Sequence, residues 1–177
     1  AGATISFDPN IRPDIMGNPE DVIERIETLV SLSHLVKAST DDISWLYPGR
    51  SVDDVVKSWR DAGASIVVVT KGPEGALVST SSHNVAAPSR AVAVQDTIGA
   101  GDSFMAGFLV GLKDKGLLGI GGLGLGAVSS ADLEDCLQLA QSCAAFTIAQ
   151  VGSNPPTRRD LANQAVPSHR SPVAERS

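Results

Sequence analysis

Cysteine is scarce in this chain, which has two cysteines among its 177 residues. Cys136 and Cys143 stand seven positions apart in a segment with helical periodicity. A straight helix would separate them by roughly 10 Å at 1.5 Å per residue, which exceeds the reach of a disulfide bond. We therefore expect two reduced thiols in the core and a cytoplasmic protein.

Other absences exclude further classes of protein. The three histidines are scattered and form no metal-ligand pattern. No run of lysine and arginine offsets the net charge of −6, which argues against a nucleic-acid-binding surface. No apolar run approaches the ~18 residues that a membrane span needs. We expect small-molecule partners, no nucleic acid and no membrane.

What the chain does contain is an alternation of short apolar strands and amphipathic helices, followed by a hairpin pattern and two longer helices. The length suits one domain with a sizeable core. Strands alternating with helices predict an α/β fold, with a mostly parallel sheet covered by helices on both faces. After Asn163 the chain is rich in proline, serine and charge, so we expect disorder over 164–177. The expected strands are 3–7, 35–38, 65–70, 76–79 and 85–87; the expected helices are 19–33, 40–46, 52–62, 99–113 and 130–150.

A glycine-rich segment at 119–124 satisfies the G-x-G-x-x-G pattern of dinucleotide-binding folds. It follows a predicted helix rather than a strand, and no acidic residue about 20 positions later ends a second strand. We interpret it as a connection between two helices.

The segment Asp-Thr-Ile-Gly-Ala-Gly-Asp at 96–102 carries the chemistry of the chain. Gly99 and Gly101 let the backbone bend so that several N–H groups point at one spot, and a helix start adds partial positive charge there. Asp102 lies in the first helical turn, where its carboxylate can accept a proton from a hydroxyl that attacks a phosphate. A glycine turn with a capping aspartate is the alternative reading.

This segment and the residues after it, to Phe108, resemble the second signature of the ribokinase-like (PfkB) family of carbohydrate kinases. Phe-Asp-Pro-Asn-Ile-Arg-Pro at 7–13 is similar to a segment of fructokinases and 2-keto-3-deoxygluconate kinases. Val-Lys-Ala-Ser at 36–39 and Thr-Lys-Gly-Pro-Glu-Gly at 70–75 follow in family order. The resemblance extends to Leu161 and implies a ribokinase-like, Rossmann-like fold. It also implies that residues 1–163 are the C-terminal part of a kinase domain, without the N-terminal half and its lid.

The resemblance assigns the catalytic centre to the 96–102 turn. Asp102 matches the catalytic base, which also contacts the acceptor hydroxyl. Gly99, Ala100 and Gly101 match the anion hole, whose backbone N–H groups stabilise charge on the transferred phosphoryl group.

Two ion sites are also implied. Asp96 and the carbonyls of Ile98, Thr147 and Gly152 match a site for a monovalent cation such as K⁺, since hard oxygen ligands suit it. Asp42 stands where many relatives carry a glutamate associated with Mg²⁺. Aspartate is one methylene shorter, which an indirect contact through water tolerates. Capping of the next helix is the other reading of this segment.

The remaining matches concern the two substrates. Asn10 and Arg12 fall where fructokinase-like relatives approach the sugar and phosphate, and the guanidinium suits phosphate or carboxylate. A solvated loop is the other interpretation. The positions that match ATP contacts are Ser39, Thr70, Gly72, Gln141, Ala144, Ala145 and Asn154.

The resemblance implies ATP-dependent phosphorylation of a sugar hydroxyl, most like fructokinase. Two alternatives stay open: 2-keto-3-deoxygluconate kinase or another sugar kinase of the family, and a catalytically silent nucleotide-binding fragment. Without sugar contacts and a lid, water is not excluded and the acceptor is not positioned, so we expect the isolated fragment to be inactive. A homodimer of the full-length protein is left open.

Overall fold

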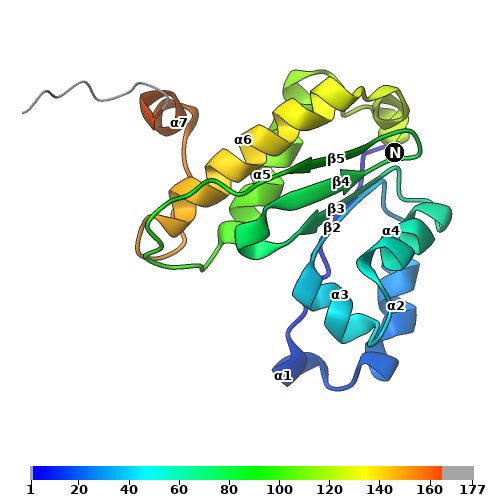
Figure 1. Cartoon of the computed structure of the whole chain (residues 1–177). Coiled ribbons are helices and arrows are strands. Elements are labelled where there is room, and N and C mark those ends of the chain that lie inside the picture. The colour runs from blue at the N-terminus through cyan, green and yellow to red at the C-terminus, as the bar shows by residue number, and fades with distance from the viewer. Residues whose placement is uncertain (1, 165–177) are drawn as a thin grey trace, which may run out of the picture.

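A five-stranded sheet forms the centre of the chain in the computed structural model, which describes residues 2–164 (Figure 1). The strand order follows the sequence, β1-β2-β3-β4-β5. The first three strands are parallel, and the last two continue the sheet as an antiparallel hairpin. This confirms the predicted α/β fold. The strands are β1 (Ser6–Phe7), β2 (Leu35–Ser39), β3 (Ile66–Thr70), β4 (Ala76–Ser79) and β5 (Asn84–Ala87).

Helices cover both faces of the sheet (Figure 1). Helices α5 and α6 pack on one face, and α2, α3 and α4 pack on the other. The α-helices are α1 (Pro13–Met16), α2 (Pro19–Ser31), α3 (Thr40–Leu46), α4 (Val52–Asp61), α5 (Ala100–Asp114), α6 (Ser130–Ile148) and α7 (Arg158–Gln164). Two 3-10 segments, η1 (Gly72–Glu74) and η2 (Ile120–Ala127), complete the described chain.

Alternate side chains of the central strands point to opposite helical layers, because successive residues of a strand face opposite sides of a sheet. Leu35, Ile66 and Val68 pack under α5 and α6. Val36 and Val67 pack with α2, α3 and α4. All five side chains are fully buried, and each such burial contributes about 1.5–3 kcal/mol relative to exposure. The two layers therefore hold the sheet from both sides.

Reciprocal capping boxes of serine and aspartate stabilise the first turns of two helices, α3 and α6. The Asp42 N–H donates to Ser39 Oγ at 3.0 Å, and the Ser39 N–H donates to the Asp42 carboxylate at 2.8 Å. Ser129 and Asp132 form the same reciprocal pair at the start of α6. Such a cap contributes about 0.5–2 kcal/mol. Because Ser39 is also the last residue of β2, α3 begins directly at the end of that strand.

Helices α5 and α6 approach closely because glycines face cysteines between them. A Cβ on Gly107 would lie 2.8 Å from Cys143 Sγ, and one on Gly111 would lie 2.9 Å from Cys136 Sγ. Both cysteines are free and buried, as predicted. Burial raises the pKa of Cys136 to about 11 and also raises the pKa of Cys143, so both thiols stay protonated at neutral pH.

The glycine-rich segment at 119–124 lies between α5 and α6, which confirms its interpretation as a connection between helices. The Gly121 N–H donates to the Gly2 carbonyl at 2.7 Å, and Thr4 Oγ1 donates to the Gly119 carbonyl at 2.8 Å. The segment therefore holds the residues that precede β1.

Other expectations need correction. The buried strand expected at 3–7 is two residues long, and Ile5 is 46% exposed, because within the described residues β1 pairs only with β2. The sequence patterns used above do not predict α1 or α7. Thr157, directly before α7, and Asp160, in its first turn, form a capping pair that would have indicated this helix. The disorder expected over 164–177 lies outside the described residues from 165 onward, and Gln164 ends α7.

Candidate functional site

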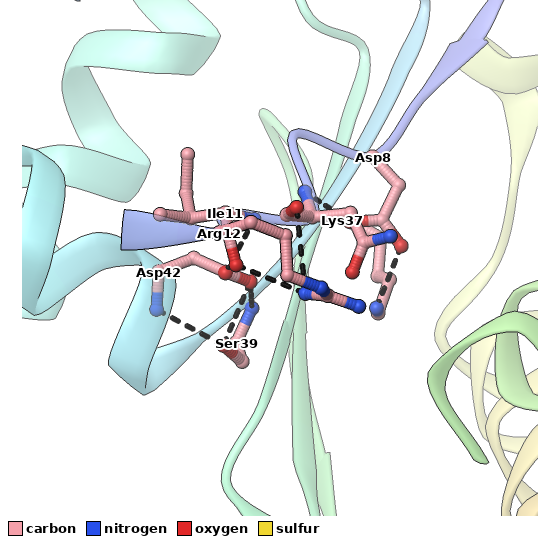
Figure 2. A network of polar contacts seen from close by, with 7 residues as sticks. Asp8, Ile11, Arg12, Lys37, Ser39 and Asp42 are labelled. Atoms are coloured by element: carbon pink, nitrogen blue, oxygen red, sulfur yellow. Dashed lines mark hydrogen bonds and ion pairs between the residues drawn. The ribbon is translucent and has the colours of Figure 1, made fainter. Parts of the chain in front are cut away.

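Several of the predicted site residues lie where the parallel strands end. Ser39 and Thr70 lie side by side at the ends of β2 and β3. Phe7 pairs with Val36, so Asp8 leaves β1 at the same edge of the sheet. Open α/β sheets bind ligands beyond the carboxyl ends of their strands. Figure 2 shows the polar network that the described chain builds at this edge.

The start of α5 supplies a point for binding an anion. Gly99 caps the helix in the left-handed region at φ +76°, and a Cβ there would collide with the side chain of Ser153. Of the predicted anion-hole residues Gly99, Ala100 and Gly101, Ala100 does not offer a free donor, because its N–H donates to the Thr97 carbonyl at 3.3 Å. The N–H groups of Gly101 and Asp102 have no acceptor among residues 2–164. These two donors, with the helix dipole, favour an anion at this position.

Asp102 lies in the first turn of α5 with its side chain exposed. Its carboxylate is thus part of the same turn as the two free N–H groups. An anion held by those groups would be close enough for Asp102 to accept a proton from an attacking hydroxyl. The sequence predicts Asp102 in the first turn of this helix, where the structure has it, and the catalytic role of Asp102 stays a prediction.

Lys37 and Asp8 form an ion pair beside the start of α5, in which the lysine is buried and the aspartate partly buried. Lys37 Nζ lies 2.7 Å from Asp8 Oδ2, and the two side chains are 6% and 18% exposed. A Cβ on Gly101 would lie 3.0 Å from Lys37 Nζ, so the ammonium group reaches the first turn of α5. Lysine is almost never buried without a partner. The described chain therefore uses Asp8 to hold a positive charge beside the start of the helix.

Asn10 and Arg12 lie on the exposed loop after β1. Asn10 adopts φ +43°, a left-handed conformation that asparagine tolerates, and its N–H donates to Asp8 Oδ1 at 3.1 Å. The guanidinium of Arg12 donates to the carbonyl of Ile11 at 2.9 Å. Both side chains are exposed at this edge of the sheet, and their substrate role stays a prediction.

Asp42 is fully engaged by the protein. Its Oδ2 accepts from the backbone N–H of Ser39 at 2.8 Å and from the Ser39 hydroxyl at 2.7 Å. Its Oδ1 accepts from the N–H of Ile11 at 2.9 Å, which ties the loop after β1 to α3 (Figure 2). The capping alternative is thus confirmed for Ser39 and Asp42. Because the two carboxylate oxygens of Asp42 together accept three hydrogen bonds, a water-mediated contact with Mg²⁺ fits Asp42 better than direct ligation.

Asp96 joins two loops that lie far apart in the sequence. Its Oδ1 accepts from the N–H of Ile98 and its Oδ2 from the N–H of Gly152, each at 3.0 Å. These two backbone hydrogen bonds, the one from Ile98 first, hold the pKa of Asp96 below its ordinary value. Asp96, Ile98 and Gly152, three of the four residues predicted to hold a monovalent cation, therefore lie together.

The fourth, Thr147, is fully buried in the last turn of α6. Its carbonyl accepts from the N–H of Gln150 at 3.2 Å, and the carbonyl of the next residue, Ile148, accepts from Gln95 at 2.7 Å. No group of three or more His, Cys, Asp or Glu in the described chain could hold a metal ion. A cation at this site would therefore depend mainly on carbonyl oxygens.

The predicted ATP contacts occupy two places. Thr70 ends β3, and Gly72 opens η1 with φ +54°, so both lie at the edge described above. Gln141 is buried in α6, and its amide donates to the Ala87 carbonyl at 3.4 Å. Ala144 is partly buried against the core and Ala145 is buried. Asn154 is exposed and donates to Gln150 at 2.8 Å.

Sequence reasoning assigned no role to Asp8 or Lys37, although both belong to the motifs at 7–13 and 36–39. A lysine inside an apolar strand was the available signal, since burial of its charge requires a partner. The identity of that partner depends on how β1 and β2 are paired, which the motifs do not specify.

Comparisons with known proteins agree with the motifs. The sequence model of one family, described as "pfkB family carbohydrate kinase", matches residues 1–159. The chain is 42% identical over 118 residues to fructokinase from Rhizobium leguminosarum bv. trifolii, a match that covers 67% of this chain and 36% of that protein. It is 34% identical over 164 residues to probable fructokinase-5 from Arabidopsis thaliana, which covers 90% of this chain and 48% of that protein.

A solved structure supports the same relationship. The chain superposes on a double mutant of Vibrio cholerae O395 fructokinase, in its fructose-, ADP- and potassium-bound form, with a TM-score of 0.73 and 28% identity. The match covers 89% of this chain and 49% of that one. The chain thus spans about half or less of the length of these relatives. Among the described helices, none is long and apolar enough to cross a membrane.

Proposed function

Because the chain belongs to the pfkB family of carbohydrate kinases, we propose that the protein transfers the γ-phosphoryl group of ATP to a hydroxyl of a sugar. The observation that carries this proposal is the first turn of α5. There the exposed carboxylate of Asp102 stands beside the free N–H groups of Gly101 and Asp102 itself.

In the proposed reaction, the sugar hydroxyl oxygen forms a bond to the γ-phosphorus while the bond from that phosphorus to its bridging oxygen breaks. The electron pair of the broken bond leaves with ADP. Asp102 accepts the hydroxyl proton as the attack proceeds. The N–H groups at the start of α5 stabilise the charge that spreads over the transferred group, because they are held in place before the reaction begins.

Fructose is the acceptor that we propose first, because the two sequence relatives are named fructokinase or probable fructokinase and the solved relative holds fructose. Asn10 and Arg12 would contact it from the loop after β1. The residues at the ends of β2 and β3, Ser39, Thr70 and Gly72, would contact the phosphates of ATP. Gln141, Ala144, Ala145 and Asn154 would lie near the adenine.

The residues present fit a monovalent cation and a magnesium ion. Asp96 and the carbonyls of Ile98, Thr147 and Gly152 would hold K⁺, which supplies positive charge behind the anion-binding turn. Each oxygen of Asp96 accepts one hydrogen bond and retains a lone pair for the cation. Mg²⁺ would reach Asp42 through water and would neutralise phosphate charge. The free thiols support the cytoplasmic location, and the homodimer stays a prediction.

The test is a coupled ADP-release assay of the complete gene product with fructose, ribose and 2-keto-3-deoxygluconate. Asp102→Asn should lower kcat by about 10²–10⁴-fold, because the proton acceptor is lost, with ATP affinity nearly unchanged. Asp53→Asn is the matched control, since Asp53 lies exposed in the first turn of α4. Near-normal turnover in Asp102→Asn would remove Asp102 from its role. A wild-type protein inactive on every sugar would favour the silent nucleotide-binding alternative.

A further inference from the structure

The buried ammonium group of Lys37 is aimed at the place where the proposed reaction needs positive charge. On β2, Lys37 is two residues after Leu35, which packs under α5 and α6. Since strand residues two apart share a face, Lys37 points toward α5 rather than toward α3. Its Nζ accordingly lies 3.0 Å from where a Cβ of Gly101 would be.

The ammonium group of Lys37 and the positive end of the α5 helix dipole therefore lie side by side. The start of α5 carries the partial charge of the helix dipole and the free N–H groups of Gly101 and Asp102. An ammonium group beside it is repelled unless negative charge is also present. Within residues 2–164 only Asp8 accepts a hydrogen bond from Lys37, and an ammonium group has three donors. Two donors therefore remain for an anion bound at the turn.

We propose that Lys37 is a further catalytic residue, which donates to the phosphoryl group during transfer, and that Asp8 is its positioning residue; this rests on the proposed kinase function. Lys37 acts through hydrogen bonding and charge and takes no part in the proton transfer. The sugar oxygen bonds to phosphorus, the bridging-oxygen bond breaks toward ADP, and Asp102 takes the hydroxyl proton. Lys37 lowers the barrier because its charge faces the oxygens of the transferred group in a buried setting.

Asp8 couples this charge to the loop that carries the predicted acceptor contacts. One of its carboxylate oxygens accepts from Lys37 and the other from the N–H of Asn10 (Figure 2). The same side chain thus holds both the ammonium group and the left-handed turn that leads to Arg12. Arg12 is exposed and bonds to its own loop, so Lys37 is the cation that is held in advance.

The experiment compares kcat and the KM for ATP in the complete gene product. Lys37→Met should lower kcat by about 10²–10³-fold, the usual effect of losing one charge-stabilising donor, with the KM for ATP changed less than about threefold. Lys37→Arg should retain more activity than Lys37→Met, since it keeps the charge. Lys57→Met is the matched control, because Lys57 is 70% exposed in an ion pair with Asp61.

A purely structural role is tested by removing both partners. Lys37→Met alone leaves the partly buried Asp8 carboxylate without its partner and should lower the thermal midpoint. The double variant Lys37→Met/Asp8→Asn should recover much of that midpoint, because no unpaired charge remains, while kcat stays low. Recovery of kcat in the double variant would overturn the assignment, as would a rise in the KM for ATP with kcat unchanged.

These outcomes separate the two proposals. If the wild-type protein phosphorylates a sugar and Lys37→Met/Asp8→Asn does so at a similar rate, only the role of Lys37 is wrong. If the wild-type protein phosphorylates no sugar, the proposed function is wrong and the assignment of Lys37 fails with it.

Discussion

Asp96 and Gly152 are joined by a 3.0 Å hydrogen bond from the Gly152 N–H to the Asp96 carboxylate, across 56 positions of sequence. The bond ties the loop after α6 to the loop before α5. The other oxygen of Asp96 holds the N–H of Ile98, directly before the anion-binding turn. The position of that turn therefore depends on a contact with the far end of α6.

The first prediction concerns the monovalent cation that we propose for this junction. Replacing K⁺ by tetramethylammonium in the assay of the complete gene product should lower kcat, because a bulky cation cannot be held by the carbonyls of Ile98 and Gly152. Ionic strength is kept constant with the same chloride concentration. Identical rates in the two salts would remove Asp96 and Ile98 from a role in holding a metal.

The second prediction follows from the cap of α6. Hydrogen bonds from Ser129, and then the contact with Lys115, lower the pKa of Asp132 from 3.8 to about 2. Because the folded pKa is the lower one, the contribution of Asp132 is complete above the unfolded value and is lost as the pH falls toward about 2. Asp132→Asn should therefore unfold at a lower temperature than wild type at pH 7. Thermal melts should show this difference shrinking between pH 4 and pH 2.

A control separates the cap from a general loss of charge. Asp61→Asn removes a carboxylate that is 61% exposed and that, among the residues the structure describes, pairs only with Lys57, so it should change the melting temperature little. An Asp132→Asn difference that stays constant over the acid range would contradict the linkage.

The third prediction concerns the contact of α5 with α6. Gly107→Ala would place a Cβ 2.8 Å from Cys143 Sγ and 2.9 Å from the Cα of Ala140. Such overpacking should lower the free energy of unfolding by about 1–3 kcal/mol, measured by urea denaturation. Gly126→Ala is the matched control, because no atom of residues 2–164 lies within 4 Å of a Cβ there. Equal stability of the two variants would show that the helices separate at no cost.

The fourth prediction concerns residues 1–177 alone. The chain covers 36% and 48% of the two curated relatives described above, and the predicted ATP contacts all lie within it. Calorimetric titration should therefore detect weak binding of Mg·ATP at best, and the coupled assay should detect negligible phosphorylation. Rapid turnover by these residues alone would place the whole acceptor site within them.

The sequence predicts those parts of the site that are local. The turn at 96–102 has its glycines and carboxylates within one short segment, so their spacing is enough to place the start of α5. The capping pair Ser39 and Asp42 is local for the same reason. Long-range contacts are different. The pairing of Lys37 with Asp8 requires that Phe7 lie beside Val36. A one-residue slip in the register of β1 against β2 would move the side chains of one strand to the other face of the sheet relative to the other strand.

The length and burial of β1 also depend on long-range contacts that the sequence pattern does not specify. An apolar run predicted a buried strand at 3–7, but burial depends on what lies on both edges of a strand. In the described chain β2 covers one edge only, and Ile5 remains 46% exposed. An apolar composition indicates that a segment suits the interior of a sheet, but it does not indicate whether strands pair with both of its edges.

The glycine–cysteine contacts between α5 and α6 make this interface easy to observe. The chain has two cysteines, and each thiol lies against a glycine of the opposite helix. Burial and the raised pKa of each thiol protect both from alkylation while the helices are packed together. A maleimide added to the native protein therefore labels only those molecules in which α5 and α6 have separated. The labelling rate then reports how often these two helices separate.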